Sequence, residues 1–249
     1  MATRDEMAAS FGSAAKEYEA GRPTYPAAAV RWLLAPIGPR PRVADVGAGT
    51  GKLTAALVDA GADVIAVEPD AAMLATLRET LPAVETLIGS AERMNLPDES
   101  VDAVAFGQAW HWVDVAAASA EVGRVLKPGG VLGLVWNIRD ETTPWVARLG
   151  AIMKGSHAEE LLAGAGPTVA APFGTLERRT WRWSRRLTRS ELAAMVRSRS
   201  YVITAASGER DRILAEVDEL FAASCHPVED GVDVVDLPYR TEVFRSIRG

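Results

Sequence analysis

The most constraining feature of this sequence is a glycine-rich bend between an apolar segment and an amphipathic one. The apolar segment Arg42–Val46 is followed by glycine at positions 47, 49 and 51, and Lys52 then opens a helical pattern. Glycine lets the backbone turn tightly and approach a ligand without Cβ collisions. The helix that follows directs its unpaired N–H groups toward the same place. We therefore expect an α/β fold with a ligand at this bend.

Short apolar runs alternate with amphipathic stretches from about Arg42 to Asn137. The runs are mostly β-branched, as in strands buried on both faces of a parallel sheet. They predict strands at Arg42–Val46, Asp63–Val67, Val84–Ile88, Val101–Phe106 and Val131–Val135, with helices at Leu53–Ala60, Ala71–Thr80 and Ala116–Leu126. This alternation predicts a doubly wound α/β sheet, which binds ligands at the edge where its strands end.

The flanking segments continue the pattern less regularly. Helical pieces are expected before residue 37, and a mixture of loop and helix over Asp140–Phe173. Later segments predict a strand at Glu177–Leu187, helices at Ser190–Tyr201 and Arg210–Ala223, and a final apolar run at Val232–Ile247.

Charge and composition exclude several classes of protein. The chain has 249 residues, of which 48% are hydrophobic and 24% charged, as in ordinary globular domains. A formal net charge of −6 removes the global attraction to phosphate, so no nucleic-acid partner is expected. No apolar run reaches the roughly 18 residues of a spanning helix, which predicts no membrane insertion and a cytoplasmic location. The single cysteine, Cys225, excludes a disulfide framework and a multi-cysteine zinc site, and no metal is expected.

An acidic residue follows the glycine bend by about twenty positions. Glu68 ends the second expected strand, where its carboxylate can accept from both hydroxyls of a ribose, at about 1.5–3 kcal/mol for each charge-assisted bond. Dinucleotide sites favour G-x-G-x-x-G, whereas this chain has G-x-G-x-G with Lys52 at the place of the third glycine. The spacing favours an adenosine cofactor other than a dinucleotide.

Together these residues resemble the class I S-adenosylmethionine-dependent methyltransferases, especially the type 11 small-molecule branch. Val43–Thr54 resembles the cofactor loop of that family, Glu68 its ribose-binding acid, residues 89–92 its adenine edge and residues 126–130 the turn before its fifth strand. The resemblance implies a mostly parallel seven-stranded sheet, S-adenosyl-L-methionine as methyl donor and S-adenosyl-L-homocysteine as product. It implies cofactor contacts from Tyr18, Arg22, Asp45, Gly47, Ala48, Gly49, Gly51, Glu68, Pro69, Ser90, Ala91, Glu92 and Gln108. Many relatives carry Asp where Ser90 stands, so either Ser90 or Glu92 is expected to meet the adenine.

The resemblance also implies one methyltransferase domain over residues 1–249. Residues 1–41 would form an N-terminal lid, residues 42–137 the cofactor-binding core, and residues 138–249 a helical insertion, the last strands and an acceptor-side cap. The run Tyr18–Pro26 resembles the lid segment, in which Arg22 would meet the methionyl carboxylate while Tyr18 and Tyr25 border the acceptor. The alternative is a proline-bounded turn that ties an N-terminal helix to the sheet.

The loop after the fourth strand points to a small-molecule acceptor. It runs Phe106-Gly107-Gln108-Ala109-Trp110-His111-Trp112 and lacks the Asn/Asp-Pro-Pro-aromatic sequence typical of methyltransferases that act on nucleobases. An amide, an imidazole and two indoles predict an apolar pocket with a few directed donors. The catalytic candidates are Gln108, His111 and Tyr25, and the acceptor-binding candidates are Tyr25, Trp110, His111, Trp136 and Asn137; each also has an ordinary structural interpretation.

Two chemistries remain open for the acceptor. A carboxylate needs no base, so Gln108 and His111 would only hold its oxygens, whereas a phenol, alcohol or amine would need His111 as general base. The run of the chain is most similar to carboxyl methyltransferases that act on trans-aconitate or fatty acids, which favours the first chemistry. Rivals of other classes are a non-catalytic S-adenosylmethionine-binding module and a nicotinamide-dependent oxidoreductase, the latter disfavoured by the glycine spacing and by the lack of a Tyr-x-x-x-Lys pair.

Eight arginines lie within Arg178–Arg199, together with Trp181 and Trp183. Because side chains alternate along a strand, the two tryptophans share one face and Arg182 points to the other. We expect a solvated charged face rather than a nucleic-acid surface; an alternative is that some arginines attract an acidic substrate. His157 and His226 are expected in irregular surface segments.

Overall fold

The computed structural model describes residues 22–153, 157–199, 202–203, 205–228 and 231–249, which divide into two compact units. The large unit comprises Thr24–Asn137, His157–Trp181 and Thr241–Gly249. The small unit comprises the described parts of Met1–Pro23, Ile138–Ser156 and Arg182–Arg240. The division of residues 1–249 into lid, core and cap stays a prediction.

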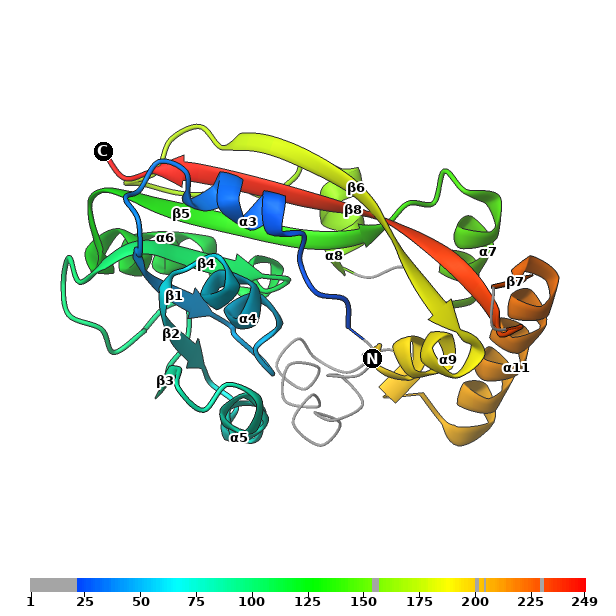
Figure 1. The fold of residues 1–249 in the computed structure, drawn as a ribbon. Helices are drawn as coiled ribbons and strands as arrows, with labels where there is room; N and C mark the ends of the chain where they lie inside the picture. Colours follow the sequence, from blue (N-terminus) through cyan, green and yellow to red (C-terminus); the bar gives the residue numbers. More distant parts are fainter. Residues whose placement is uncertain (1–21, 154–156, 200–201, 204, 229–230) are drawn as a thin grey trace. The chain divides into compact units, whose positions relative to one another are not determined.

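The sheet has the predicted doubly wound order. Strands β1 (Arg42–Val46), β2 (Asp63–Glu68), β3 (Glu85–Ile88), β4 (Val101–Gly107) and β5 (Leu126–Arg139) pair in parallel. With β6 (Glu177–Thr188) and β8 (Asp233–Ile247), the order is β3-β2-β1-β4-β5-β8-β6. Strand β8 runs opposite to β5 (Figure 1). Its C-terminal neighbour Arg248 donates its N–H to the Gly130 carbonyl at 2.8 Å. The strand β7 (His226–Pro227), which was not predicted, pairs with β8.

Helices cover both faces of the sheet in the large unit. Figure 1 shows helices α3 (Ala27–Leu34) and α4 (Lys52–Asp59) beside the sheet. They bury Leu33 and Leu57 in a core with Val43, Val64 and Ala103. Helix α5 (Ala71–Thr80) packs its own leucines against β2. Helix α6 (Val115–Val125) begins at Asp114, whose carboxylate accepts the N–H of Ala117. Helix α8 (His157–Ala163) completes this unit.

The small unit has its own apolar core. Helices α7 (Pro144–Met153), α9 (Arg189–Arg197) and α11 (Ser207–Ser224) enclose it with residues from β6 and β8. Leu149, Leu192, Val217, Phe221 and Leu237 are buried there. The two tryptophans of β6 point inward, Trp181 in the large unit and Trp183 in the small one, as the alternation predicts.

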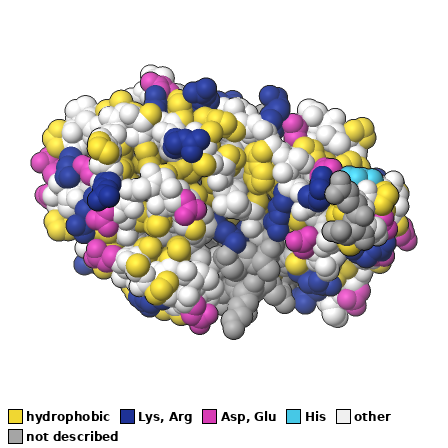
Figure 2. Space-filling model, in the orientation of Figure 1, with side chains coloured by type: hydrophobic (Ala, Val, Ile, Leu, Met, Phe, Trp, Pro, Cys, Tyr) yellow, Lys and Arg dark blue, Asp and Glu magenta, His cyan; other side chains and the backbone are white. Residues whose placement is uncertain are grey.

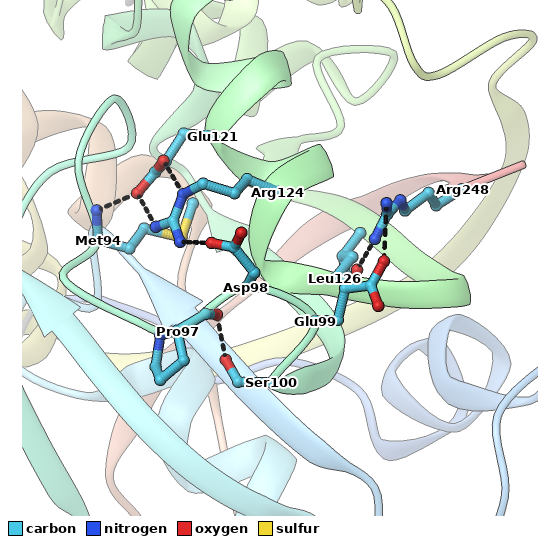
Figure 3. Close-up of polar contacts among 9 residues, drawn as sticks. All are labelled: Met94, Pro97, Asp98, Glu99, Ser100, Glu121, Arg124, Leu126 and Arg248. Carbon is cyan, nitrogen blue, oxygen red and sulfur yellow. Dashed lines mark hydrogen bonds and ion pairs between the residues drawn. The ribbon is translucent and has the colours of Figure 1, made fainter.

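Polar contacts fix the segment that leads into β4 (Figure 3). Arg124 of α6 binds Glu121 at 2.8 Å and Asp98 at 2.5 Å, and Glu121 also accepts the Met94 N–H at 2.8 Å. Arg248 pairs with Glu99 at 3.2 Å. The contacts tie this segment to the helix and to the C-terminal residues of the chain.

Strand β5 is the clearest departure from the expected boundaries. It was expected only at Val131–Val135, because Lys127-Pro128-Gly129-Gly130 carries turn residues. Leu126 already pairs with Val101 before a register shift, so the turn residues lie within the strand. The positions expected for His157 and His226 are also wrong: they begin α8 and β7, although both side chains are exposed.

Candidate active site

The glycine bend requires glycine for steric reasons. Gly47, Gly49 and Gly51 have φ angles of 67°, 58° and 95°, in the left-handed region that side chains disfavour. A Cβ at Gly47 would lie 2.7 Å from the Cβ of Ala109. The N–H groups of Gly47 and Ala48 both donate to the Val67 carbonyl, at 2.9 and 3.2 Å. The bend is thereby anchored to the end of β2.

Glu68 accepts a hydrogen bond from the glycine bend, a contact additional to the ribose contact that was expected of it. Its Oε2 accepts the Gly49 N–H at 3.0 Å, and its Oε1 accepts the Asp70 N–H at 3.1 Å. Burial raises the pKa of the Glu68 carboxyl, and the two N–H bonds counteract that shift. A carboxylate has about four acceptor sites, so both oxygens retain capacity for ligand hydroxyls. Sequence spacing indicated the ligand role but not this second one.

Asp45 lies fully buried beneath the bend. Thr54 of α4 donates its hydroxyl to Oδ2 at 2.6 Å, while Oδ1 has no hydrogen-bond partner among the described residues. Burial raises the pKa of this carboxyl from 3.8 to about 7. An unsatisfied buried acceptor is costly unless a ligand satisfies it. Together with the glycine bend, this oxygen fits a cofactor that presents hydrogen-bond donors, as the ammonium of S-adenosylmethionine does.

The expected adenine edge is only partly available. Glu92 is exposed, and its carboxylate accepts the N–H of Asp114 at 3.0 Å, at the start of α6. Ser90 exchanges two backbone hydrogen bonds with Arg93, and Ala91 is buried beside them. The predicted adenine contact of Ser90 or Glu92 stays a prediction. Pro69, the remaining predicted contact after β2, is exposed.

Gln108 adopts a strained backbone directly after β4. Its φ is 59°, which is uncommon for a residue other than glycine. Residues with such backbone conformations cluster at functional sites. The backbone N–H donates to the Val135 carbonyl at 2.8 Å, and Nε2 donates to the Asn137 carbonyl at 2.9 Å. The neighbouring strand β5 thus fixes both ends of the residue.

Both polar atoms of the Asn137 side chain form hydrogen bonds within the protein. Its Nδ2 donates to the Thr24 carbonyl at 3.0 Å, and its Oδ1 accepts the Thr241 hydroxyl at 2.6 Å. The side chain is 6% exposed. Asn137 thus connects Gln108 to the segment before α3, and its expected contact with the acceptor stays a prediction.

A hydrogen bond joins the side chains of His111 and Trp136. The Nε1–H of Trp136 donates to Nδ1 of His111 at 3.3 Å, and the indole itself is fully buried. An indole N–H can only donate, so Nδ1 must carry its lone pair in this contact. A neutral His111 ring then has its proton on Nε2. The expected direct contact of Trp136 with an acceptor stays a prediction.

The other aromatic residues divide between packing and the site. Trp110 is 2% exposed and donates its Nε1–H to the Thr168 carbonyl at 2.9 Å, so it packs within the large unit, and its expected contact with the acceptor stays a prediction. Trp112 is half-buried, with its ring centroid 4.8 Å from that of His111 and 5.5 Å from that of His157. His157 was missed because its approach to Trp112 has no local sequence signal.

Tyr25 is buried against the end of β4. A Cβ at Gly107 would lie 2.9 Å from its hydroxyl, so glycine at 107 makes room for Tyr25. Arg22 belongs to the small unit and lies 3.5 Å from the Ser198 carbonyl. Tyr18 lies outside the described residues. The predicted contacts of Tyr25 and Arg22 with ligands stay predictions.

On β6, Arg178, Arg182 and Arg186 share one face of the strand and are paired with acids. Arg178 binds Glu242 at 3.0 Å, and Arg186 lies 3.3 Å from Asp236. On the face that Figure 2 presents, basic and acidic side chains lie interspersed. In the described part of the chain, no cluster of three or more His, Cys, Asp or Glu side chains is arranged to hold a metal ion. No helix among those residues has the length and apolar character that crossing a membrane requires.

Comparisons with known proteins agree with this geometry. Residues 44–134 match the family described as "Methyltransferase domain". An uncharacterized methyltransferase of Mycobacterium tuberculosis is 48% identical over 98% of each chain, and a methyltransferase-like protein of Schizosaccharomyces pombe is 35% identical over 95% of this chain and 94% of its own. A malonyl-[acyl-carrier protein] O-methyltransferase of Methylococcus capsulatus is 38% identical over 49% of this chain and 48% of its own.

Solved structures show the same fold. A structure from Anaeromyxobacter dehalogenans, whose name places it among the type II methyltransferases, has a TM-score of 0.67 and 26% identity, covering 91% of this chain and 97% of its own. The near full-length relatives and the doubly wound sheet support one assignment. The chain belongs to the class I S-adenosylmethionine-dependent methyltransferases.

Proposed function

We propose that the protein transfers a methyl group from S-adenosyl-L-methionine to the carboxylate oxygen of a small organic acid. The observation that carries this proposal is the hydrogen bond from Trp136 Nε1 to His111 Nδ1. It supports a His111 ring whose Nε2–H donates a hydrogen bond. A donor suits a carboxylate, whereas a general base would need Nε2 without its proton.

The residues then have distinct tasks. S-adenosyl-L-methionine supplies a methyl group already activated by its sulfonium. Glu68 and Asp45 would accept hydrogen bonds from its hydroxyl and ammonium groups, and the glycine bend would admit it close to the backbone. Burial of the Asp45 carboxyl keeps solvent from competing for its oxygens.

On the acceptor side, His111 Nε2–H and the second amide N–H of Gln108 would hold one carboxylate oxygen. The other oxygen attacks the methyl carbon, a C–O bond forms, the C–S bond breaks, and S-adenosyl-L-homocysteine leaves. No proton is transferred, so alignment of the two reactants supplies much of the rate. The Methylococcus relative is named as a malonyl-[acyl-carrier protein] O-methyltransferase, which is consistent with an acidic acceptor.

The test is a panel of small carboxylic acids, phenols and amines, each incubated with the protein and S-adenosyl-L-methionine, with products detected by mass. We expect methyl esters and no methylated phenols or amines. With the accepted acid, kcat should stay flat between pH 6.5 and 9. Products only from phenols or amines would contradict the proposal, and no product from any acceptor would favour a binding module.

Two substitutions at His111 separate a donor from a base. His111→Gln places an amide N–H near the position of Nε2, whereas His111→Ala removes it. If His111 is a donor, the Gln variant retains at least ten times the kcat of the Ala variant, and both bind S-adenosyl-L-homocysteine as the unaltered protein does. Equal loss in the two variants, with kcat rising with pH, would assign His111 as base and overturn the carboxylate proposal.

A further inference from the structure

A buried pair of polar side chains joins β5 to β8 inside the large unit. The Thr241 hydroxyl donates to Asn137 Oδ1 at 2.6 Å, and the two residues are 0% and 6% exposed. Val135 and Val243, two positions away on the same face of their strands, belong to the apolar core that includes α3. Replacing both partners of a buried hydrogen bond by apolar groups of the same shape can leave stability nearly unchanged. Stability alone therefore does not explain a polar pair on this face.

A third residue fixes the orientation of the Asn137 amide. Its Nδ2 donates to the Thr24 carbonyl at 3.0 Å. Because a backbone carbonyl can only accept, the amide must turn Nδ2 toward Thr24 and Oδ1 toward Thr241. The Thr241 hydroxyl, as the donor to Oδ1, keeps the amide in the one orientation that holds the Thr24 carbonyl.

The segment held in this way packs against the loop that carries Gln108. Tyr25, which follows Thr24, is 7% exposed, and a Cβ at Gly107 would lie 2.9 Å from its hydroxyl. Gln108 comes directly after that glycine, and its Nε2 donates to the Asn137 carbonyl at 2.9 Å. Asn137 therefore binds both parts of this arrangement, with its backbone at Gln108 and its side chain at Thr24.

We propose that Thr241 is a positioning residue for methyl transfer. It acts through the Asn137 amide, which holds Thr24 and Tyr25 against the loop of Gln108, so that the acceptor meets Gln108 in a fixed place. The inference rests on the proposed function, in which the Gln108 amide holds a carboxylate oxygen. Displacing a site group by about 1 Å can lower a rate by about 100-fold, so a residue outside the site can control kcat.

The first test compares Thr241→Val, which removes the hydroxyl and keeps the shape, with Thr241→Ser, which keeps the hydroxyl. Methyl transfer is measured with malonate, succinate, octanoate and benzoate as acceptors, and binding of S-adenosyl-L-homocysteine by calorimetry. We expect kcat to fall about tenfold or more in Thr241→Val and to stay within about threefold in Thr241→Ser. The Kd for S-adenosyl-L-homocysteine should change by less than about twofold in both variants, because the hydroxyl does not hold the cofactor loop.

Hydrogen exchange without any ligand tests the positioning itself. The N–H groups of Ala29 and Val30 bond to the Pro26 carbonyl at the start of α3, directly after the segment that Asn137 holds. In Thr241→Val these two amides should exchange about tenfold faster or more, while amides of β1 and β4 change by less than about twofold. Faster exchange throughout the large unit would indicate a purely structural role and would overturn the proposal.

Thr180→Val is the matched control. The Thr180 hydroxyl donates to the Glu242 carboxylate at 2.7 Å, on the opposite face of β8 from Thr241. This variant should keep the kcat and the Ala29 exchange rate of the unaltered protein, and a loss equal to that of Thr241→Val would overturn the proposal.

The outcomes separate this proposal from the proposed function. If the unaltered protein methylates one of the four acids, unchanged kcat in Thr241→Val overturns the role of Thr241 and leaves the proposed function intact. If it methylates none of them, the proposed function fails for these acids, and the exchange of Ala29 and Val30 alone decides on Thr241. If Thr241→Val does not fold, Thr241→Ala removes the same hydroxyl and takes its place in both tests.

Discussion

Asp45 has the least ordinary surroundings of any residue at the site. It is fully buried, accepts one hydrogen bond from Thr54, and lies near the carboxyl of Glu68. Burial disfavours the charged form, and Glu68 adds a like charge, so the pKa of Asp45 rises from 3.8 to about 7. This residue couples the stability of the large unit to pH.

The sign of that coupling follows from proton uptake. Between pH 3.8 and about 7 the folded Asp45 holds a proton that the unfolded chain has lost, so its contribution to stability falls as pH rises. Asp45→Asn cannot ionise and keeps an oxygen for Thr54. In urea unfolding, we expect the free energy of unfolding of the variant to increase relative to that of the unaltered protein between pH 4.5 and pH 7.5. The increase should be at most about 4 kcal/mol. A difference that does not change with pH would show that Asp45 is ionised in the folded protein.

Some contacts of single residues were predictable from the sequence, and others were not. The spacing of glycines and Glu68 was sufficient to place them together, because strand ends meet at one edge of a parallel sheet. The roles of Asn137 and Trp136 were not accessible, since their partners Thr24, Thr241 and His111 are 25 or more positions away. Sequence patterns report which side chains face a sheet edge, but not which of them bind one another.

Among the elements, α9 has the most explicit start signal. The Thr188 side chain accepts the Glu191 N–H at 3.4 Å, and Glu191 accepts the Thr188 N–H at 2.8 Å, which together form a capping box. The reciprocal bonds lower the pKa of the Glu191 carboxyl. Leu192 and Met195 of this helix lie in the core of the small unit, so the cap also positions that core.

Thr188→Ala should therefore destabilise the small unit by about 1 kcal/mol, the usual cost of losing an N-cap. Thr188→Ser keeps the hydroxyl and should lower the free energy of unfolding by no more than about a few tenths of a kcal/mol. Urea unfolding curves of the two variants and the unaltered protein measure the difference. Equal midpoints for all three would mean that packing of Leu192 and Met195 alone determines the helix start.

Helices and strands were predictable where the hydrophobic periodicity and the capping or turn residues indicate the same boundaries. Helix α5 occupies Ala71–Thr80 as expected, since Asp70 caps its start. The C-terminal end of strand β5 was underestimated because its last residues include Asn137 and Arg139, which are polar and still buried. Local pattern reading assigns polar residues to loops, and only tertiary hydrogen bonds keep these within the sheet.

At the scale of the whole molecule, the predicted cofactor contacts are distributed unevenly. Of those that the structure describes, all except Arg22 lie in the large unit. Binding protects the groups that a ligand covers or rigidifies from exchange with solvent. The two units are thus expected to respond differently to the cofactor.

Hydrogen exchange with and without S-adenosyl-L-homocysteine tests this expectation. Amides of residues 47–51, 68–70, 89–92 and 107–111 should exchange at least tenfold more slowly with ligand bound. Amides within α7, α9 and α11 should change by less than a factor of two. Protection concentrated in those helices, with none at residues 47–51, would place the cofactor elsewhere.

Three of the boundaries between the two units fall within strands. They fall between Asn137 and Ile138 in β5, between Trp181 and Arg182 in β6, and between Arg240 and Thr241 in β8. Strands β6 and β8 each supply residues to both hydrophobic cores, so a cut at these boundaries would remove part of each core. We therefore expect neither unit to keep its fold when it is excised from the chain or transplanted into another protein.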